Sequence, residues 1–348
     1  MIATKALPPV RPRRPRPLVA CLVLLGALCV IAVTALGTGD FRLSPGQVID
    51  TLLGGGPPGG HFVVLELRLP RLLVGFAVGA ALGMAGAVFQ SLTRNPLGSP
   101  DVIGFTVGSA SGGLLVILVF SGGTLAIALG AVGGGMLTAL AVFLLALRGG
   151  IQGTRLVLVG IGISAMLEAF NVYLLSRASV NEAQSASAWL VGSLNARGWE
   201  HLRPLSVALL LLIPCALVLV GELRMLQLGD ETAAVLGVRV QRSRVALMTV
   251  AVALTAVATA TAGPVAFIAL TAPPLAHWLT RGPGPDLVAS GLMGACVLTL
   301  GDLAAQRLLA PTQLPVGVMT GVIGGGYLCL LLLTQSRAAR PGPSSQSG

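Results

Sequence analysis

Apolar positions in this chain run in long unbroken stretches, and charged residues are confined to short segments between them. Leu18 to Gly39, Leu72 to Thr93 and Val102 to Leu147 contain no charged residue. A helix of about 20 apolar residues crosses the hydrocarbon core of a bilayer. The 46 residues from Val102 to Leu147 are therefore long enough for two helices, with a turn near Ser121 to Gly123. The pattern predicts an all-α polytopic membrane protein.

The apolar runs predict about ten transmembrane helices in a single domain. Gly263 and Pro264 divide one long run into two, and the ninth helix is short. The domain covers 18–336, between a basic tail (1–17) and a disordered tail (337–348). The predicted spans are 18–37, 72–91, 102–120, 124–147, 156–175, 204–221, 245–262, 265–280, 287–301 and 316–334.

Composition and charge agree with a membrane protein and orient it. Only 10% of the 348 residues are charged, against about 25% in soluble domains. Most of the 22 Lys and Arg residues fall on the side of the two termini, and such residues concentrate in the cytoplasm. Both termini of this multi-pass protein are therefore predicted to be cytoplasmic. Since the basic residues flank apolar runs, the net charge of +10 does not indicate a nucleic-acid partner.

The N-terminal run and two polar segments complete this layout. The arginines from Arg11 to Arg16 precede an apolar run that resembles a signal peptide, but its length and the spans that follow favour a retained helix. "SPGQVIDTLL" predicts a short surface helix capped by Ser44. A second surface helix is expected between Arg177 and Arg203, where Trp189 and Trp199 suit the membrane interface.

A stripe of glycines marks the second predicted span. Gly75, Gly79 and Gly83 recur every fourth residue, and small residues at this spacing let helix backbones approach closely. Tight helix packing is the favoured interpretation of this stripe, and lining of a pore is the alternative.

The sequence excludes several kinds of chemistry. Lys5 is the only lysine, so a Walker A loop is impossible, and neither H-E-x-x-H nor G-x-S-x-G occurs. The five cysteines and three histidines are scattered, which predicts no metal site. The chain is therefore not expected to be an enzyme or to bind a cofactor directly.

Glu168 is the one acidic residue well inside a predicted span. Asn171 lies three residues later, on the same helix face. An intramembrane carboxyl group is costly and is a candidate for function. We weigh a protonated Glu168 bonded to a neighbouring helix against a polar patch on a solute path or a proton relay.

The segment "LGDETAAVLGVRV" (228–240) is a polar island between two spans. Asp230 is expected to be the N-cap of a short helix, with Glu231 in its first turn. Gly237 is expected to end this helix in the left-handed conformation, before a second short helix. Val235 and Leu236 would form an exposed apolar edge, which suits a docking site better than a plain loop.

Here the chain resembles a known family: the permease subunits of type II ABC importers for iron-siderophore complexes and cobalamin (FecCD). Segment 228–240 is similar to their coupling helices. Three further motifs in the same order resemble family signatures. These are "LRLPRLLVGFAVGAALGMAGAVFQSLTRNPLGSPDVIGFTVGSASGG" (67–113), "GPVAFIALTAPPLAHWL" (263–279) and "GDLAAQRLLAPTQLPVGVMTGVIGGGYL" (301–328).

The resemblance implies a place in the bacterial inner membrane and partners for the chain. A second permease, identical or related, would complete the translocation path. Two ABC ATPase subunits would bind at Asp230, Glu231, Val235, Leu236 and Gly237 and would use the ATP. An extracytoplasmic substrate-binding protein would deliver the ligand.

The resemblance also implies roles for further residues. Arg68 and Arg71 match outward-facing arginines that dock the binding protein. Arg307 is a weaker match, because the family position aligns with Gln306. Gly153 and Thr154, before the fifth span, match the inner gate. Pro273 to His277 and Glu168 depart from the family pattern.

The leading hypothesis is the permease of an ATP-driven importer of ferric siderophores. Cobalamin or haem is the alternative ligand within this class. A proton-coupled secondary transporter that uses Glu168 is the alternative from another class, and a structural scaffold is a third. The sequence does not distinguish one siderophore from another, or a homodimer from a heterodimer.

Overall fold

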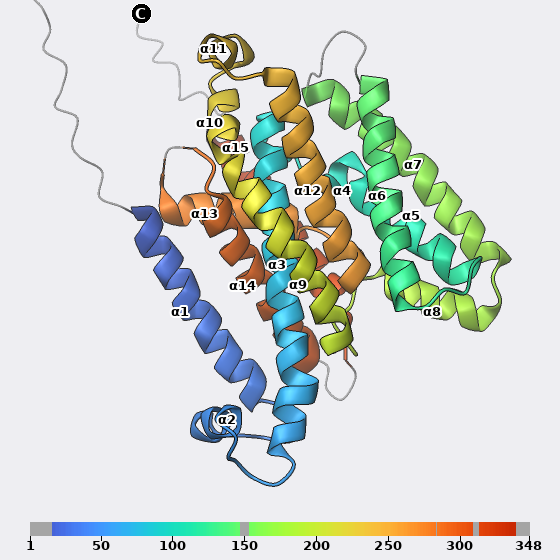
Figure 1. Ribbon diagram of the computed structural model, residues 1–348, viewed down its shortest axis with the longest axis vertical. Helices are drawn as coiled ribbons and strands as arrows, with labels where there is room; N and C mark the ends of the chain where they lie inside the picture. The colour runs from blue at the N-terminus through green and yellow to red at the C-terminus, as the bar shows by residue number, and fades with distance from the viewer. Residues whose placement is uncertain (1–15, 147–152, 283, 309–312, 339–348) are drawn as a thin grey trace, which may run out of the picture.

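The computed structural model describes residues 16–146, 153–282, 284–308 and 313–338. Within these ranges every regular element is a helix, which confirms the all-α prediction (Figure 1). The elements are α1 (Arg16–Gly37), α2 (Pro45–Leu52), the π-helix η1 (Phe62–Arg68), α3 (Leu69–Thr93), α4 (Pro100–Ile103), α5 (Phe105–Leu118), α6 (Thr124–Ala146), α7 (Gly153–Arg177), α8 (Val180–Leu190), α9 (Trp199–Val218), α10 (Val220–Gln227), α11 (Asp230–Val235), α12 (Val240–Ala262), α13 (Ile268–Thr280), α14 (Leu287–Arg307) and α15 (Val316–Ala338).

Seven helices in the described residues are long and apolar enough to cross a membrane. Two further apolar helices, Phe105–Leu118 and Val316–Leu330, are shorter. Each of the ten predicted ranges lies largely on a helix, so the helices were placed well, while the number of crossings stays a prediction. The seven spans are Pro17–Gly37, Phe62–Thr93, Thr124–Ala146, Arg155–Arg177, Trp199–Val218, Val240–Ala262 and Leu287–Arg307.

Three predicted boundaries need correction. The ninth span was expected to be short, but α14 has 21 residues. The third span is interrupted, because Gly104 adopts a left-handed conformation (φ 91°) between α4 and α5. α15 continues to Ala338, two residues into the predicted C-terminal tail. The rest of that tail and nearly all of the predicted N-terminal tail lie outside the described residues.

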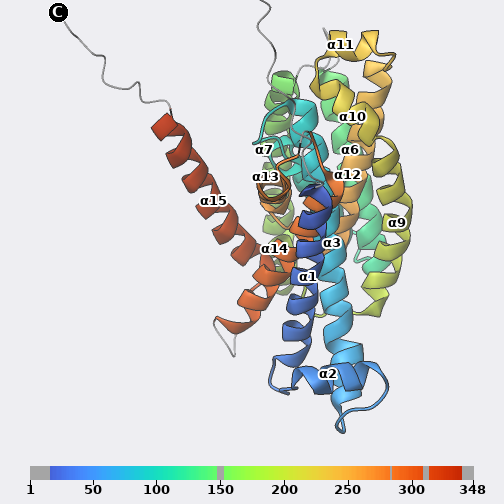
Figure 2. The same cartoon turned by 90° about the vertical axis from the view of Figure 1, so that its left-hand side faces the viewer.

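α3 forms the centre of the bundle, with α14, α12 and α13 packed around it (Figures 1 and 2). A Cβ atom added to Gly79 would lie 2.5 Å from the carbonyl oxygen of Gly294 and 2.7 Å from the Cα of Ala295. A Cβ atom on Gly83 would lie 2.2 Å from the carbonyl oxygen of Ser290 on α14, and one on Gly75 would lie 3.0 Å from the side chain of Thr299. The glycine stripe therefore lets the backbones of α3 and α14 touch, which confirms the packing interpretation.

Both predicted surface helices are present, at one end of the bundle, and α11 lies at the opposite end (Figure 1). We name these the α2 end and the α11 end. Ser44 and Gln47 cap α2 reciprocally, and Ser179 and Glu182 do the same for α8. Hydrogen bonds from the hydroxyl and the backbone N–H of Ser179 lower the pKa of Glu182.

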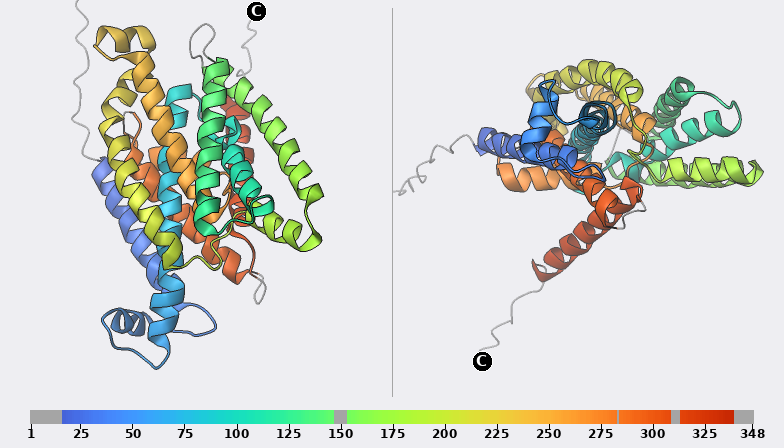
Figure 3. Two further views of the ribbon diagram at one scale, coloured as in Figure 1. Left: turned by 45° about the vertical axis from the view of Figure 1, so that its right-hand side comes forward. Right: turned by 90° about the horizontal axis from the view of Figure 1, so that it is seen from below.

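Two long helices lie at the periphery. α7 packs mainly on α4, α5 and α6, and only 17% of its apolar membrane-spanning stretch is buried inside the structure. α15 packs on α14 and α13 and then projects away from the bundle (Figure 2). Seen from the α2 end, α7 and α15 diverge and leave an open angle between them (Figure 3). Apolar faces of both helices are therefore uncovered within this chain.

Candidate functional site

The α10–α11 hairpin forms a knob at the α11 end. Leu223, Leu226 and Ala233 are buried and anchor the knob in the core. Val235 and Leu236 are 88% and 55% exposed at its tip, as the sequence predicts. This is a rigid base that presents an apolar edge to the outside.

The turn chemistry of α11 was predicted in part. Gly237 has φ +89°, and the N–H groups of Gly237 and Val238 donate to the carbonyl oxygens of Ala234 and Ala233. The predicted second short helix is instead the first turn of α12, which runs unbroken from Val240 to Ala262.

The prediction of Asp230 as an N-cap is wrong. Gly229 (φ +114°) occupies that position, and Asp230 is the first residue of α11. One oxygen of Asp230 accepts hydrogen bonds from Arg94 at 3.0 Å and from Arg244 at 2.8 Å. Arg94 also donates to the carbonyl oxygen of Leu226 at 2.8 Å. Asp230 thus ties the knob to the end of α3 and the start of α12.

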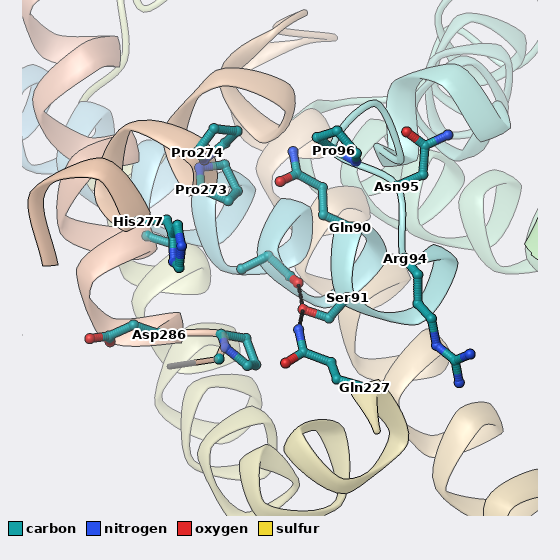
Figure 4. A pocket seen from close by; sticks show the side chains of 14 residues that line it. Gln90, Ser91, Arg94, Asn95, Pro96, Gln227, Pro273, Pro274, His277 and Asp286 are labelled. Carbon is teal, nitrogen blue, oxygen red and sulfur yellow. Dashed lines mark hydrogen bonds between the residues drawn. The ribbon is translucent and has the colours of Figure 1, made fainter. Parts of the chain in front are cut away.

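A pocket of about 510 Å³ opens beside the knob, between the end of α3, α13 and the start of α14 (Figure 4). Two of the family-like motifs meet there: Gln90 and Asn95 belong to 67–113, and Pro273 and Pro274 belong to 263–279. Gln227, at the end of α10, also lines the pocket and directly precedes the motif 228–240. The amide of Gln227 donates to Ser91 at 3.1 Å and so joins α10 to α3. Parts of two motifs therefore meet beside the knob at the α11 end.

The predicted docking arginines lie at the α2 end but differ in exposure. Arg71 donates to both oxygens of Asp302 on α14, at 3.0 and 2.8 Å, and the two side chains are only 16% and 10% exposed. Arg68 donates to the carbonyl oxygens of Leu36 and Phe41. Arg307 is exposed. Arg68 and Arg71 thus have contacts inside the chain, which the sequence did not indicate.

A cavity of about 310 Å³, lined mainly by apolar side chains, lies between α5, α7, the end of α8 and the start of α15. We call it the inner cavity. Glu168 and Asn171 line it, as their shared helix face predicts. Glu168 is exposed and has no hydrogen bond among the described residues, so the predicted bond to a neighbouring helix is not formed there.

Asp101 is a second carboxylate at the inner cavity, which the sequence analysis missed. It accepts a hydrogen bond from the Thr106 hydroxyl at 2.5 Å and one from the N–H of Phe267 at 3.2 Å. Phe267 has φ +69° and ends the break between α12 and α13. Asp101 lies one residue before the predicted third span, so it did not count as an acidic residue inside a span, and the break at Gly104 beside it was not predicted.

The predicted gate residues Gly153 and Thr154 are the first residues of α7, and their side chains lie outside the described part of the structure. Within the described residues, no three His, Cys, Asp or Glu side chains are grouped so that they could hold a metal ion.

Comparison with known proteins gives concordant matches. The model of the FecCD transport family matches residues 24–334. The ferric enterobactin transport system permease protein FepG of Escherichia coli is 48% identical over 322 residues, which cover 92% of this chain and 98% of FepG. The Fe(3+)-citrate import system permease protein YfmE of Bacillus subtilis is 36% identical over 327 residues, 93% and 98% of the two chains.

Among solved structures, a metal-chelate type ABC transporter in an inward-facing conformation superposes with a TM-score of 0.82. It is 29% identical, and the match covers 90% of this chain and 98% of that one.

Proposed function

The chain belongs to the FecCD transport family, and we propose that it is the membrane subunit of an ATP-driven importer that carries ferric siderophore complexes into the cytoplasm. The exposed apolar tip of the α10–α11 knob is the observation that carries this proposal. The names of FepG and YfmE, both permeases for ferric chelates, support the choice of ligand.

In this proposal the knob receives the force of ATP hydrolysis. Val235 and Leu236 insert into a groove of the ATPase, and Glu231 and Gly237 shape the rim and the turn. Because Asp230 is bonded to Arg94 and Arg244, a push on α11 reaches both α3 and α12. These helices belong to the packed core, so the movement passes to the bundle as a rigid unit.

A second permease, identical or related, covers the uncovered faces of α7 and α15. The translocation path then runs along this interface, and the inner cavity opens onto it. Glu168 and Asn171 belong to the path, and Gly153 and Thr154 to its inner gate.

The α2 end faces the extracytoplasmic binding protein, and the α11 end faces the cytoplasm. Ten crossings place both termini on the cytoplasmic side. The exposed Arg307 is the best-placed of the three arginines for docking, where charge pairs chiefly assist steering and register. Arg68 and Arg71 support docking indirectly, since they hold α1, α3 and α14 together.

The test is purification of the tagged chain from its native membrane in a mild detergent, with and without Val235→Asp. The unchanged chain should bring a soluble protein with a Walker A loop in stoichiometric amount, and the variant should lose it. Val180→Asp is the matched control, because Val180 is 75% exposed but lies on α8, at the opposite end. Equal recovery of the ATPase with both variants, or none with the unchanged chain, would refute the proposal. A secondary transporter would have no such partner.

A further inference from the structure

α2 carries an apolar side that is largely uncovered within the described part of the chain. Val48 and Thr51 are buried and fasten α2 to the bundle. Ile49 and Leu52 are 52% and 43% exposed. Leu53, the C-cap of α2, is 82% exposed, more than any other leucine that the structure describes. Three large apolar side chains are therefore exposed within one short helix and its cap.

The polar residues of α2 lie on a different side. At 3.6 residues per turn, positions three apart share a side of a helix, and positions two apart point in nearly opposite directions. Ile49 and Leu52 therefore share one side. The exposed Gln47 and Asp50 share the side across the helix from them. A helix with separate apolar and polar sides can lie in the plane of the membrane interface, with its apolar side among the lipid chains.

The end of α1 places α2 at the boundary of the bilayer. The apolar stretch of α1, Pro17–Gly37, has 21 residues, which at 1.5 Å each is about 32 Å, close to the thickness of the hydrocarbon core. The N–H of Leu43 donates to the carbonyl oxygen of Gly37 at 2.9 Å, and α2 begins two residues later. α2 then lies across the end of α1 (Figures 1 and 2). Its axis therefore runs along the membrane surface and not through the membrane.

The surface of α1 beside α2 faces lipid. Only 22% of the membrane-spanning stretch of α1 is buried inside the structure, and Leu22, Leu25 and Val30 are exposed along it. α2 contacts α1 directly. Both helices lie on the opposite side of the bundle from α7, whose uncovered face the proposed function assigns to a second permease (Figure 3). Lipid is therefore the neighbour that the position of α2 favours.

We propose that α2 is a membrane anchor, in which Ile49, Leu52 and Leu53 insert among the lipid acyl chains next to the headgroups while Gln47 and Asp50 face water. Because α2 joins α1 to η1 and the start of α3, the anchor fixes the depth of the α2 end in the bilayer. This inference goes beyond the proposed function, since it requires a membrane-spanning α1 but neither an ATPase nor a particular chelate.

The experiment is photo-crosslinking in the native membrane. The photoreactive amino acid p-benzoylphenylalanine replaces Leu53 in the full chain, and after illumination the protein is purified and its adducts are identified by mass spectrometry. Gln47 is the matched control position, because it is exposed on the polar side of the same helix. Leu22, exposed on the membrane-spanning part of α1, is the positive control for reaction with lipid.

Phospholipid adducts should form at the Leu53 and Leu22 positions. Burial of one leucine side chain favours an apolar environment by at least about tenfold. The yield of lipid adduct at the Leu53 position should therefore exceed that at the Gln47 position by about the same factor.

A second measurement reports the depth of the anchor. The Leu53→Trp and Gln47→Trp variants are placed in nanodiscs of phosphatidylcholine that is brominated either near the headgroup or near the chain end. The fluorescence added to that of the three native tryptophans is then recorded. Bromine near the headgroup should quench the added fluorescence of Leu53→Trp more than bromine near the chain end, because an interfacial helix is shallow. The added fluorescence of Gln47→Trp should be quenched by neither lipid.

Equal yields of lipid adduct at the Leu53 and Gln47 positions would overturn the proposal, as would no lipid adduct at the Leu53 position while the Leu22 position reacts. A protein adduct in place of lipid at the Leu53 position would assign this side of α2 to a protein partner and would overturn it too. Loss of ATPase association would refute the proposed function alone, whereas these outcomes would refute this inference alone.

Discussion

Breaking the ion pair between Arg71 and Asp302 distinguishes a structural role of Arg71 from a role in docking the substrate-binding protein. Replacing Arg71 by Met keeps most of the side-chain volume and removes the charge. Asp302, only 10% exposed, would then keep a single side-chain donor, Gln306 at 2.7 Å. Breaking a buried pair costs about 3–5 kcal/mol. Because both side chains retain some contact with water, we expect about 3 kcal/mol, at the low end of that range.

The assay is unfolding of the purified protein in detergent, followed by loss of helical signal. Arg307→Met, at an exposed arginine of the same end, is the control and should change stability by about 0.5 kcal/mol or less. Adding Asp302→Leu to Arg71→Met should recover most of the loss, because an apolar pair leaves no buried charge. If Arg71→Met were as stable as Arg307→Met but bound the substrate-binding protein poorly, Arg71 would be a docking residue and our reasoning would be wrong.

Glycine substitutions test the packing and the knob in the same assay. Gly79→Ala should cost about 1–3 kcal/mol, because its new methyl group would enter the backbone of α14. Gly133→Ala, with nothing within 4 Å, should instead gain up to about 1 kcal/mol, and equal effects would contradict the contact between α3 and α14. Gly237→Ala should cost about 1–2 kcal/mol, because alanine is strained at the φ of +89° found there, and it should weaken ATPase association. No loss of stability or of association would show that the turn does not need this conformation. Gly221→Ala, within α10 and with open space around it, should gain up to about 1 kcal/mol like Gly133→Ala and leave ATPase association unchanged.

The sequence by itself determined the helices and the local turns. In a membrane a helix satisfies its own backbone hydrogen bonds, so long apolar runs predict helices directly. The caps of α2, the breaks at Ser121–Gly123 and Gly263–Pro264, and the left-handed Gly237 also depend on residues close in sequence. The exposed tip of α11 followed from the same local pattern.

Only the tertiary structure decided which distant side chains meet. Arg71 and Asp302 are 231 residues apart, and Asp101 and Phe267 are 166 apart. These contacts depend on which helices pack beside one another. Hydropathy places each helix in the membrane but does not determine its neighbours. Asp230 has the local properties of an N-cap, but the arrival of Arg94 from α3 and Arg244 from α12 gave it ion pairs instead. Polar groups in a bundle take the partners that packing brings to them, and the inner cavity exists for that reason.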